Sequence, residues 1–182
     1  TSRELTQEKI DRIPKLLKML ADNGHETPFE KSSFHFLVNV DQATHIHLLK
    51  HRIGVSINGE SARYKELKED KTYSPQDWPL DWGLKLIHHT KLSNTLYHEC
   101  LEELTPILGR KRAKESARFC KTYNSQITAD VSFNFRSFYH FLSLRNKPEA
   151  QKEIREIAQK MLELVKNIEG NPFEHTIKAF NL

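Results

Sequence analysis

The sequence has few cysteines and no long apolar run, and both shortages narrow the class of protein. Its only two cysteines, Cys100 and Cys120, have a spacing that fits no common metal motif, which argues for a reducing compartment and against a disulfide scaffold. No apolar segment approaches the ~20 residues needed to cross a bilayer, and the N-terminal residues lack the apolar core of a signal peptide. We therefore expect a cytoplasmic protein with no membrane partner.

Motifs of several enzyme classes are missing as well. No Gly-x-Gly-x-x-Gly or Walker-type loop occurs, so any dinucleotide is bound outside the Rossmann and P-loop plans. Neither Ser56 nor Ser61 lies in the Gly-x-Ser-x-Gly elbow of α/β-hydrolases. What remains is an ordinary composition, with 37% hydrophobic and 29% charged residues and enough length for a single domain over residues 1–182.

The charge balance favours an anionic ligand. The net charge is +4 and the pI is near 9.0, which suits nucleic acid, nucleotides and folate-like polyanions. A basic nucleic-acid-binding module is therefore one hypothesis. No aromatic stacking pattern or known reader motif accompanies the basic residues, which disfavours it.

The order of apolar patterns predicts an α+β fold. Alternating apolar residues indicate strands at 34–40 and 127–133, and a helical period indicates helices at 10–20, 84–104, 138–144 and 154–165. Pro14 is expected to kink or to start the first helix, and Pro106 and Gly109 to end the second. Asp41 is a suitable N-cap for a further helix that carries Ile46 and Leu49 inward and ends near Gly54. A short basic helix is expected at 111–120, and residues 65–83 are expected to form a loop.

A basic segment free of acidic residues is the most informative feature. Between Gln42 and Gly59 there is no Asp or Glu, while five basic residues follow closely: His45, His47, Lys50, His51 and Arg52. Ser61 and Arg63 come next, and on an extended backbone their side chains point the same way, so that both can bind one phosphate. His47 and His51 lack a nearby carboxylate or cysteine to complete a metal site. The segment therefore predicts an anion pocket without a metal.

Three segments together resemble the flavin-dependent thymidylate synthase family. The first is His25-Glu26-Thr27-Pro28-Phe29-Glu30. The second is Lys50-His51-Arg52, followed by Ser61-Ala62-Arg63-Tyr64. The third contains Asn134-Phe135-Arg136-Ser137, Phe141-Leu142-Ser143-Leu144-Arg145 and Ala150-Gln151-Lys152-Glu153-Ile154. Their order along the chain makes the resemblance far more specific than any one motif.

The resemblance implies a reaction, a set of cofactors and an assembly. Such enzymes methylate dUMP at C5, with carbon from methylenetetrahydrofolate and a hydride from reduced FAD, which NADPH or a similar donor reduces. They are homotetramers with sites between subunits, and the implied fold is α+β, with mixed helices around a central, largely antiparallel sheet. Neither Cys100 nor Cys120 lies in the Pro-Cys context that ordinary thymidylate synthases use, which agrees with a flavin route.

The resemblance also assigns roles to individual residues. Ser61 and Arg145 are expected to take part in catalysis, Arg145 by polarising the uracil ring. The positions that match nucleotide ligands are His47, Ser61, Arg63, Arg118 and Arg145. The positions that match flavin ligands are His25, Thr27, Lys50, His51, Arg52, Glu60, Asn134, Arg136 and His140, with Glu30 as a further candidate.

The sequence departs from the family pattern at several positions. Lys50 replaces the usual arginine, and one extra residue separates Arg52 from Ser61, so that either Gly59 or Glu60 takes the place of the family's glutamate. His47 replaces a usual glutamine, and Cys120-Lys121 replaces a usual Leu-Pro pair. A flavin-dependent dUMP hydroxymethylase would keep most of the same residues and is the alternative within this class.

Overall fold

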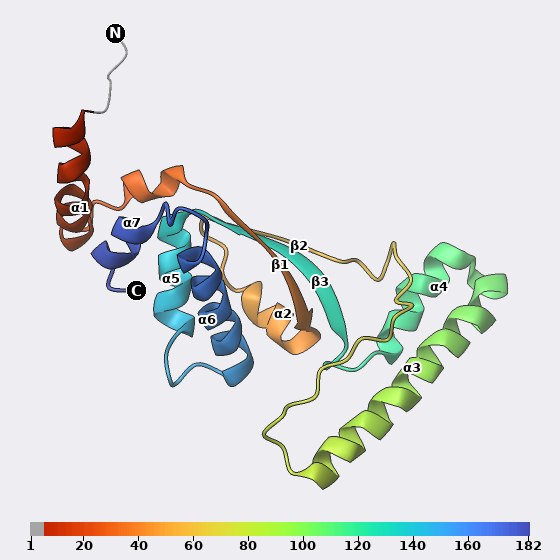
Figure 1. Ribbon diagram of the computed structural model, residues 1–182. Helices are drawn as coiled ribbons and strands as arrows, with labels where there is room; N and C mark the ends of the chain where they lie inside the picture. Colours follow the sequence, from red (N-terminus) through yellow and green to blue (C-terminus); the bar gives the residue numbers. More distant parts are fainter. Residues whose placement is uncertain (1–5) are drawn as a thin grey trace. The chain divides into compact units, whose positions relative to one another are not determined.

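The computed structural model describes residues 6–182, which form seven α-helices, two 3-10 helices and three strands (Figure 1). In chain order the elements are α1 (Gln7–Asp22), η1 (Thr27–Lys31), β1 (Phe34–Asp41), α2 (Gln42–Leu48), β2 (Val55–Gly59), α3 (Leu80–Leu108), α4 (Arg110–Ala117), η2 (Arg118–Cys120), β3 (Gln126–Phe133), α5 (Phe135–Arg145), α6 (Lys152–Lys166) and α7 (Glu174–Ala179). The predicted mixture of helices and strands is confirmed. None of the helices in this range is both long and apolar enough to span a membrane.

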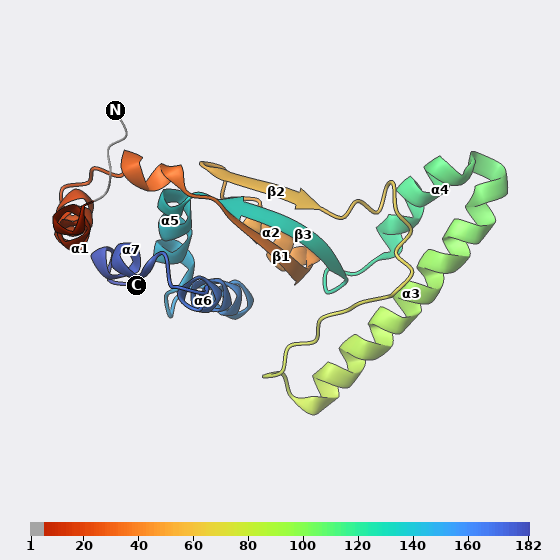
Figure 2. The same cartoon turned by 45° about the horizontal axis from the view of Figure 1, so that its top comes forward.

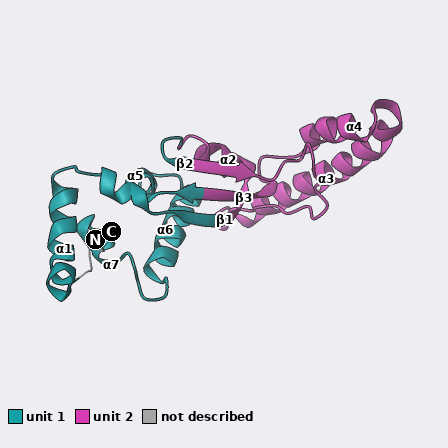
Figure 3. Cartoon of the chain, turned by 90° about the horizontal axis from the view of Figure 1, so that it is seen from above, with its two compact units in different colours: residues 1–36, 52–55, 132–182 teal, residues 37–51, 56–131 magenta. Residues whose placement is uncertain are grey.

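The three strands form one antiparallel sheet in the order β1-β3-β2. In β3 the side chains of Ile127, Ala129, Val131 and Phe133 are buried, while their neighbours are not. This alternation is what a strand with one covered face requires, and it confirms the strand predicted there. The chain divides into two compact units, and the boundary falls within each of the three strands (Figure 3).

Unit 1 contains the described residues up to Phe36 together with Arg52–Val55 and Ser132–Leu182. Phenylalanine rings fill its core. The Phe34 ring lies 5.3 Å from the Phe138 ring, and the Phe36 ring stacks on Phe138 at 5.7 Å. The amphipathic helix predicted at 154–165 is confirmed as α6, with buried Ile154, Ala158, Met161, Leu162 and Val165. Aromatic packing therefore fixes α5, which carries the Asn134–Arg145 segment.

Unit 2 contains Leu37–His51 and Ser56–Val131. Its helices α3 and α4 pack against each other, as the view from a second angle also shows (Figure 2). Their shared core consists of Tyr97, Leu101, Ala113 and Ala117, with Leu67, Cys100, Leu104 and Cys120 at its edge. The small alanines of α4 allow this close approach, and the Tyr97 hydroxyl accepts a hydrogen bond from the Leu67 amide at 3.0 Å. This bond attaches the loop after β2 to the helical pair.

Several element boundaries differ from the predictions. Helix α2 ends at Leu48 and not near Gly54, because the Lys50 and His51 amides bond the carbonyls of His47 and Leu48 three residues back, a tightening that ends the helix. Ile46 and Leu49 are 43% and 44% exposed in this chain, so the expectation that they point inward was wrong.

Neither Pro14 nor Pro106 starts or ends a helix. Pro14 lies inside α1, which begins at Gln7 and therefore does not start at the proline. Helix α3 continues through Pro106 and ends at Leu108 with Gly109 as its C-cap, so the expected stop at the glycine is confirmed and the expected stop at the proline is wrong. Pro106 has no N–H to donate to the carbonyl of Glu102. Both residues are exposed near the end of the helix, so water can donate to that carbonyl instead. Strand β2 and helix α7 were not predicted.

Candidate functional site

A cavity of about 500 Å³ in unit 2 contains several of the predicted ligands. It lies beside α2, the end of β2 and η2, and we call it the α2–β2 cavity. Glu60, Ser61 and Arg118 line it, with His45 from α2 and Tyr123 from the segment before β3. Arg118 thus shares one cavity with Glu60 and Ser61, from which it is far apart in the sequence, and the size of this cavity suits a small-molecule ligand.

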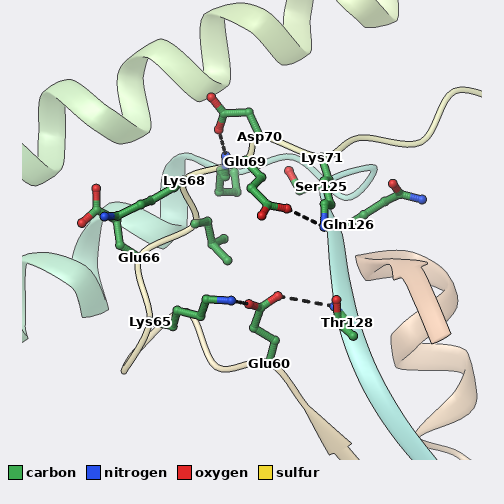
Figure 4. A pocket seen from close by; sticks show the side chains of 12 residues that line it. Glu60, Lys65, Glu66, Lys68, Glu69, Asp70, Lys71, Ser125, Gln126 and Thr128 are labelled. Atoms are coloured by element: carbon green, nitrogen blue, oxygen red, sulfur yellow. Dashed lines mark hydrogen bonds and ion pairs between the residues drawn. The ribbon is translucent and has the colours of Figure 1, made fainter. Parts of the chain in front are cut away.

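Glu60 lines this cavity and is held in place by its neighbours. Figure 4 shows it among the residues of a second cavity that it also lines. Lys65 forms an ion pair with its carboxylate, and the Thr128 amide points to Glu60 Oε2 at 3.5 Å. The hydrogen bond from Lys65 is the main reason why the pKa of Glu60 is lowered. Glu60 also lines a second cavity of about 440 Å³ beside residues 65–71. An ionised carboxylate is therefore held in place where the two cavities meet.

Ser61 and Arg63 do not lie on an extended backbone. The Tyr64 and Lys65 amides both donate to the Ser61 carbonyl, at 3.1 and 2.9 Å, which closes a turn. The premise of alternating side-chain directions is therefore wrong here, since it holds only for strands. Arg63 Nε donates to Glu115 Oε1 at 2.6 Å. This bond raises the pKa of Arg63 and lowers that of Glu115. The phosphate-binding role of Ser61 and Arg63 stays a prediction from the family motif.

Arg118 reaches the cavity from η2. Its Nε donates to the Glu115 carbonyl at 3.1 Å, and its guanidinium lies 5.9 Å from the centre of the Phe119 ring. Phe119 is 78% exposed and Tyr123 is 71% exposed, and both line the α2–β2 cavity. Glu115 therefore contacts both arginines predicted to hold phosphate, through its side chain for Arg63 and through its backbone for Arg118.

A partly buried ion pair connects the loop that follows Glu60 to the segment before β3. Lys121 Nζ is only 7% exposed at its side chain and donates to Asp70 Oδ1 and Asn94 Oδ1, each at 2.7 Å. Asp70 Oδ2 also lies 3.0 Å from His98 Nε2. Burial opposes ionisation of Asp70, but the hydrogen bonds from Lys121 and His98 prevail and lower its pKa. Lys121 lines both cavities, so this network positions their shared wall.

The predicted flavin ligands are divided between the two units. In unit 2, His47 is in the last turn of α2 and Lys50 and His51 follow the helix, but none of the three lines the α2–β2 cavity. In unit 1, Arg52 is exposed and precedes Gly54. A Cβ at Gly54 would lie 3.0 Å from Ser137 Cβ and 3.1 Å from Asn134 Nδ2, so the backbone approaches the start of α5 closely.

The start of α5 is well determined by its capping. The Asn134 side chain accepts a bond from the Ser137 amide at 2.8 Å, and Ser137 Oγ accepts one from the Asn134 amide at 3.1 Å. This capping box places Arg136 and His140 in the first two turns, and Arg145 is the last residue of the helix and half-buried. Asn134 thus serves the fold as well as its predicted role.

Arg136 binds two carboxylates of the His25–Glu30 segment. Its Nε donates to Glu26 Oε2 at 2.7 Å and its guanidinium also donates to Glu30 Oε1 at 2.5 Å. Those bonds raise the pKa of Arg136, with the bond to Glu30 as the larger cause. The structure thus brings the first and third family segments together, with His25 and Thr27 exposed beside them.

Sequence reasoning missed four residues that shape the site. Glu115 binds Arg63, and Lys65 binds Glu60. Lys121 lines both cavities, and the Nε2 atom of His45 is buried without a partner. Glu115 is 52 residues from its partner Arg63, and Lys121 is 51 residues from its partner Asp70. No local sequence pattern predicts contacts over such separations. His45 stands inside the basic segment, and its position there was the available signal.

Comparison with known proteins gives one consistent result. Residues 1–169 match the family described as thymidylate synthase complementing protein. A flavin-dependent thymidylate synthase from Pseudothermotoga lettingae is 32% identical over 171 residues, which cover 91% of this chain and 75% of the relative. Proteins of the same name from Clostridium tetani and Thermosipho melanesiensis are 28% and 31% identical, over 96% and 90% of this chain and 74% and 76% of theirs. The chain therefore belongs to the thymidylate synthase complementing protein family.

Proposed function

We propose that the protein is a flavin-dependent thymidylate synthase that converts dUMP to dTMP. The observation that carries the proposal is the α2–β2 cavity of a family member, in which Glu60, Ser61 and Arg118 converge. A hydroxyl and a guanidinium offer donors that suit the phosphate of a nucleotide, and the fixed carboxylate of Glu60 stays a predicted ligand of the flavin beside them. The names of the three relatives support methylation, and no observation favours hydroxymethylation or nucleic-acid binding.

In this proposal the nucleotide phosphate is bound by Ser61, Arg63 and Arg118. Arg63 has to exchange Glu115 for the phosphate. This exchange costs little, because Arg63 is 44% exposed at its side chain and exposed ion pairs contribute little to stability. His47 is proposed as a further ligand of the nucleotide. Arg145 would stabilise negative charge that develops on a pyrimidine carbonyl, which makes the ring more reactive at C5.

The residues predicted for FAD fit that cofactor by their chemistry. Lys50, Arg52 and Arg136 offer cations for a pyrophosphate, and His25, Thr27, His51, Asn134 and His140 offer further polar groups, all at exposed or half-exposed positions. Arg136 is tied to Glu26 and Glu30 only through exposed contacts, so it too can exchange a carboxylate for a phosphate. When bound, reduced flavin would supply the hydride for the reaction.

Methylenetetrahydrofolate is proposed as the carbon donor and NADPH as the reductant, in a cytoplasmic enzyme. We also propose a homotetramer with sites between subunits. The support for an assembly is the number of exposed apolar side chains on two helices. Leu84, Ile87, Leu92 and Leu96 on α3 are 56%, 45%, 58% and 53% exposed, and Ile10, Leu16 and Met19 on α1 are 42%, 49% and 50% exposed. Faces of this kind usually mark protein interfaces.

A flavin assay tests the proposed function directly. The purified protein should be yellow or take up FAD, and its reduced flavin should be reoxidised when dUMP and methylenetetrahydrofolate are added together. Mass spectrometry of the product then separates a methyl from a hydroxymethyl group. A protein that cannot take up FAD under any of these conditions contradicts the proposal.

A further inference from the structure

His45 is a polar residue of the α2–β2 cavity that none of the family segments includes. It lies in α2, and its side chain lines the cavity together with Gly59, Glu60 and Arg118. Its Nε2 atom is buried and has no hydrogen-bond partner. Of the two ring nitrogens, Nδ1 is therefore the one that a ligand in the cavity can reach.

Gly59 makes room for this imidazole. A Cβ at position 59 would lie 3.0 Å from His45 Nε2 and 3.3 Å from its Cε1, so any larger residue there would displace the ring. The backbone at Gly59 is not in the left-handed region. The glycine is therefore needed for the neighbouring ring and not for its own conformation, which links the two residues as one feature of the cavity.

The protonation of the ring follows from its surroundings. Burial lowers the pKa of His45, so the imidazole is neutral at pH 7 and carries a single N–H. Among backbone groups, a buried N–H without an acceptor is rarer than a buried carbonyl without a donor. By the same preference we assign the proton to Nδ1 and leave the buried Nε2 bare. His45 is thus a neutral hydrogen-bond donor.

The charges of the cavity residues indicate which part of a nucleotide each residue can bind. Arg118 and Lys121 line the same cavity, and Glu60 is already held by Lys65. Cations suit a phosphate, whereas a neutral donor suits an uncharged oxygen. We propose that His45 is a specificity-determining residue that donates from Nδ1 to an uncharged oxygen of the bound nucleoside, a sugar hydroxyl or a pyrimidine carbonyl. This inference rests on the proposed function, because it takes the cavity as the dUMP site.

Substitution of His45 tests the inference in the FAD-loaded enzyme. His45→Leu should raise the dissociation constant of dUMP about five- to tenfold, as expected for one lost neutral hydrogen bond. The same variant should leave the dissociation constant of inorganic phosphate, measured by competition, within twofold. His45→Asn keeps an amide donor close to the position of Nδ1 and should restore dUMP binding. An unchanged dUMP affinity in His45→Leu, or equal weakening of phosphate, overturns the inference.

Gly59→Ala provides an independent route to the same residue. The added methyl group should displace the ring and weaken dUMP about as much as His45→Leu does, while the double variant should be no weaker than His45→Leu alone. Additive losses would show that the two residues act separately and would contradict the inference. Wild-type protein that takes up FAD but binds no dUMP would overturn the proposed function itself. If the wild type bound dUMP and the variants bound it equally well, only the proposed role of His45 would be wrong.

Discussion

Arg63 Nε lies 2.6 Å from Glu115 Oε1, so an arginine predicted to bind a phosphate is bonded to a carboxylate of α4. Glu115 also contacts Arg112 at 3.5 Å and accepts a bond from Arg118 on its carbonyl. A nucleotide phosphate that reaches this site must therefore compete with Glu115. Because of this competition, the Arg63–Glu115 ion pair should lower the affinity for the nucleotide by a measurable amount.

Neutralising Glu115 should strengthen nucleotide binding. In Glu115→Gln the exposed ion pair is lost, and we expect the dissociation constant of dUMP to fall about two- to fivefold, because exposed pairs are weak. In Arg63→Ala the loss of a charge-assisted contact should cost roughly 1.5–3 kcal/mol and raise the constant at least tenfold. Titration calorimetry measures both.

A matched control for Glu115 is Glu66→Gln, which removes a similar ion pair with Arg110 at 2.7 Å between residues with no predicted ligand role. This variant should leave dUMP affinity unchanged. If Arg63→Ala also left it unchanged, the phosphate assignment for Arg63 would be wrong.

Arg145→Ala should separate catalysis from cofactor binding. Arg145 is the last residue of α5, and its proposed task is to stabilise charge on the pyrimidine. Removal of one such donor costs about 3–4 kcal/mol in other enzymes, so turnover should fall about 10²- to 10³-fold. The flavin content, read from the visible absorbance, should stay that of the wild type. A parallel loss of flavin would place Arg145 on the cofactor side of the site.

Local patterns predicted much of this fold because they reflect local physics. The strand at β3 follows from alternating apolar residues, and α5 and α6 follow from apolar residues at helical spacing. The pattern at 84–104 located α3, but four apolar residues of that pattern, Leu84, Ile87, Leu92 and Leu96, are exposed. The residues that the helix buries are Thr90, Ser93, Asn94, Tyr97 and Leu101. Spacing alone cannot tell a core face from a face that another molecule covers.

The candidate site was predictable only as a set of residues. The family segments supplied the positions, and the turn at Ser61 shows that the first geometric argument for them was incorrect. The partners of these residues come from elements far along the chain, such as Glu115 on α4 and Thr128 on β3, and tertiary folding decides those contacts. Strand β2 was missed because it is short, although Val55 and Ile57 do alternate with polar residues.

The Asp70–Lys121 pair should make stability depend on pH in acid. The pKa of Asp70 is lowered in the folded protein, so its ionisation adds stability above the ordinary value of about 3.9, and this contribution is lost as pH falls through the folded value. Asp70→Asn suits the test because Asp70 has a φ of 46°, a conformation that asparagine also adopts readily. At pH 7 the variant should lose roughly 1–3 kcal/mol, since Lys121 is nearly buried.

Denaturant unfolding at several pH values checks this prediction. The difference between wild type and Asp70→Asn should be largest above about pH 5 and should shrink below about pH 4. Glu69→Gln, which removes an exposed pair with Lys71, should have little effect at any pH. A constant difference between the Asp70 variant and wild type across this range would show that charge is not the cause.

Gly54→Ala should destabilise the protein more than Gly24→Ala, although both glycines have a φ of +67°. The left-handed conformation costs about 1–2 kcal/mol for any residue with a Cβ and applies to both. At Gly24 the added atom meets nothing within 4 Å, whereas at Gly54 it lies 3.0 Å from Ser137 Cβ. The excess at Gly54 should be about 1–3 kcal/mol, the usual cost of overpacking. Equal losses in urea unfolding would mean that the start of α5 shifts freely.

Leu96→Glu should reduce the size of the assembly if the exposed face of α3 is a subunit contact. Leu92 and Leu96 are 58% and 53% exposed and lie one helical turn apart, so a second copy that covers them would have to bury the new charge. Light scattering should show a homotetramer for the wild type and smaller species for the variant. Lys91→Glu changes the charge at an exposed polar position of the same helix and serves as the control. Loss of assembly in the control alone would place the contact on a different face of α3.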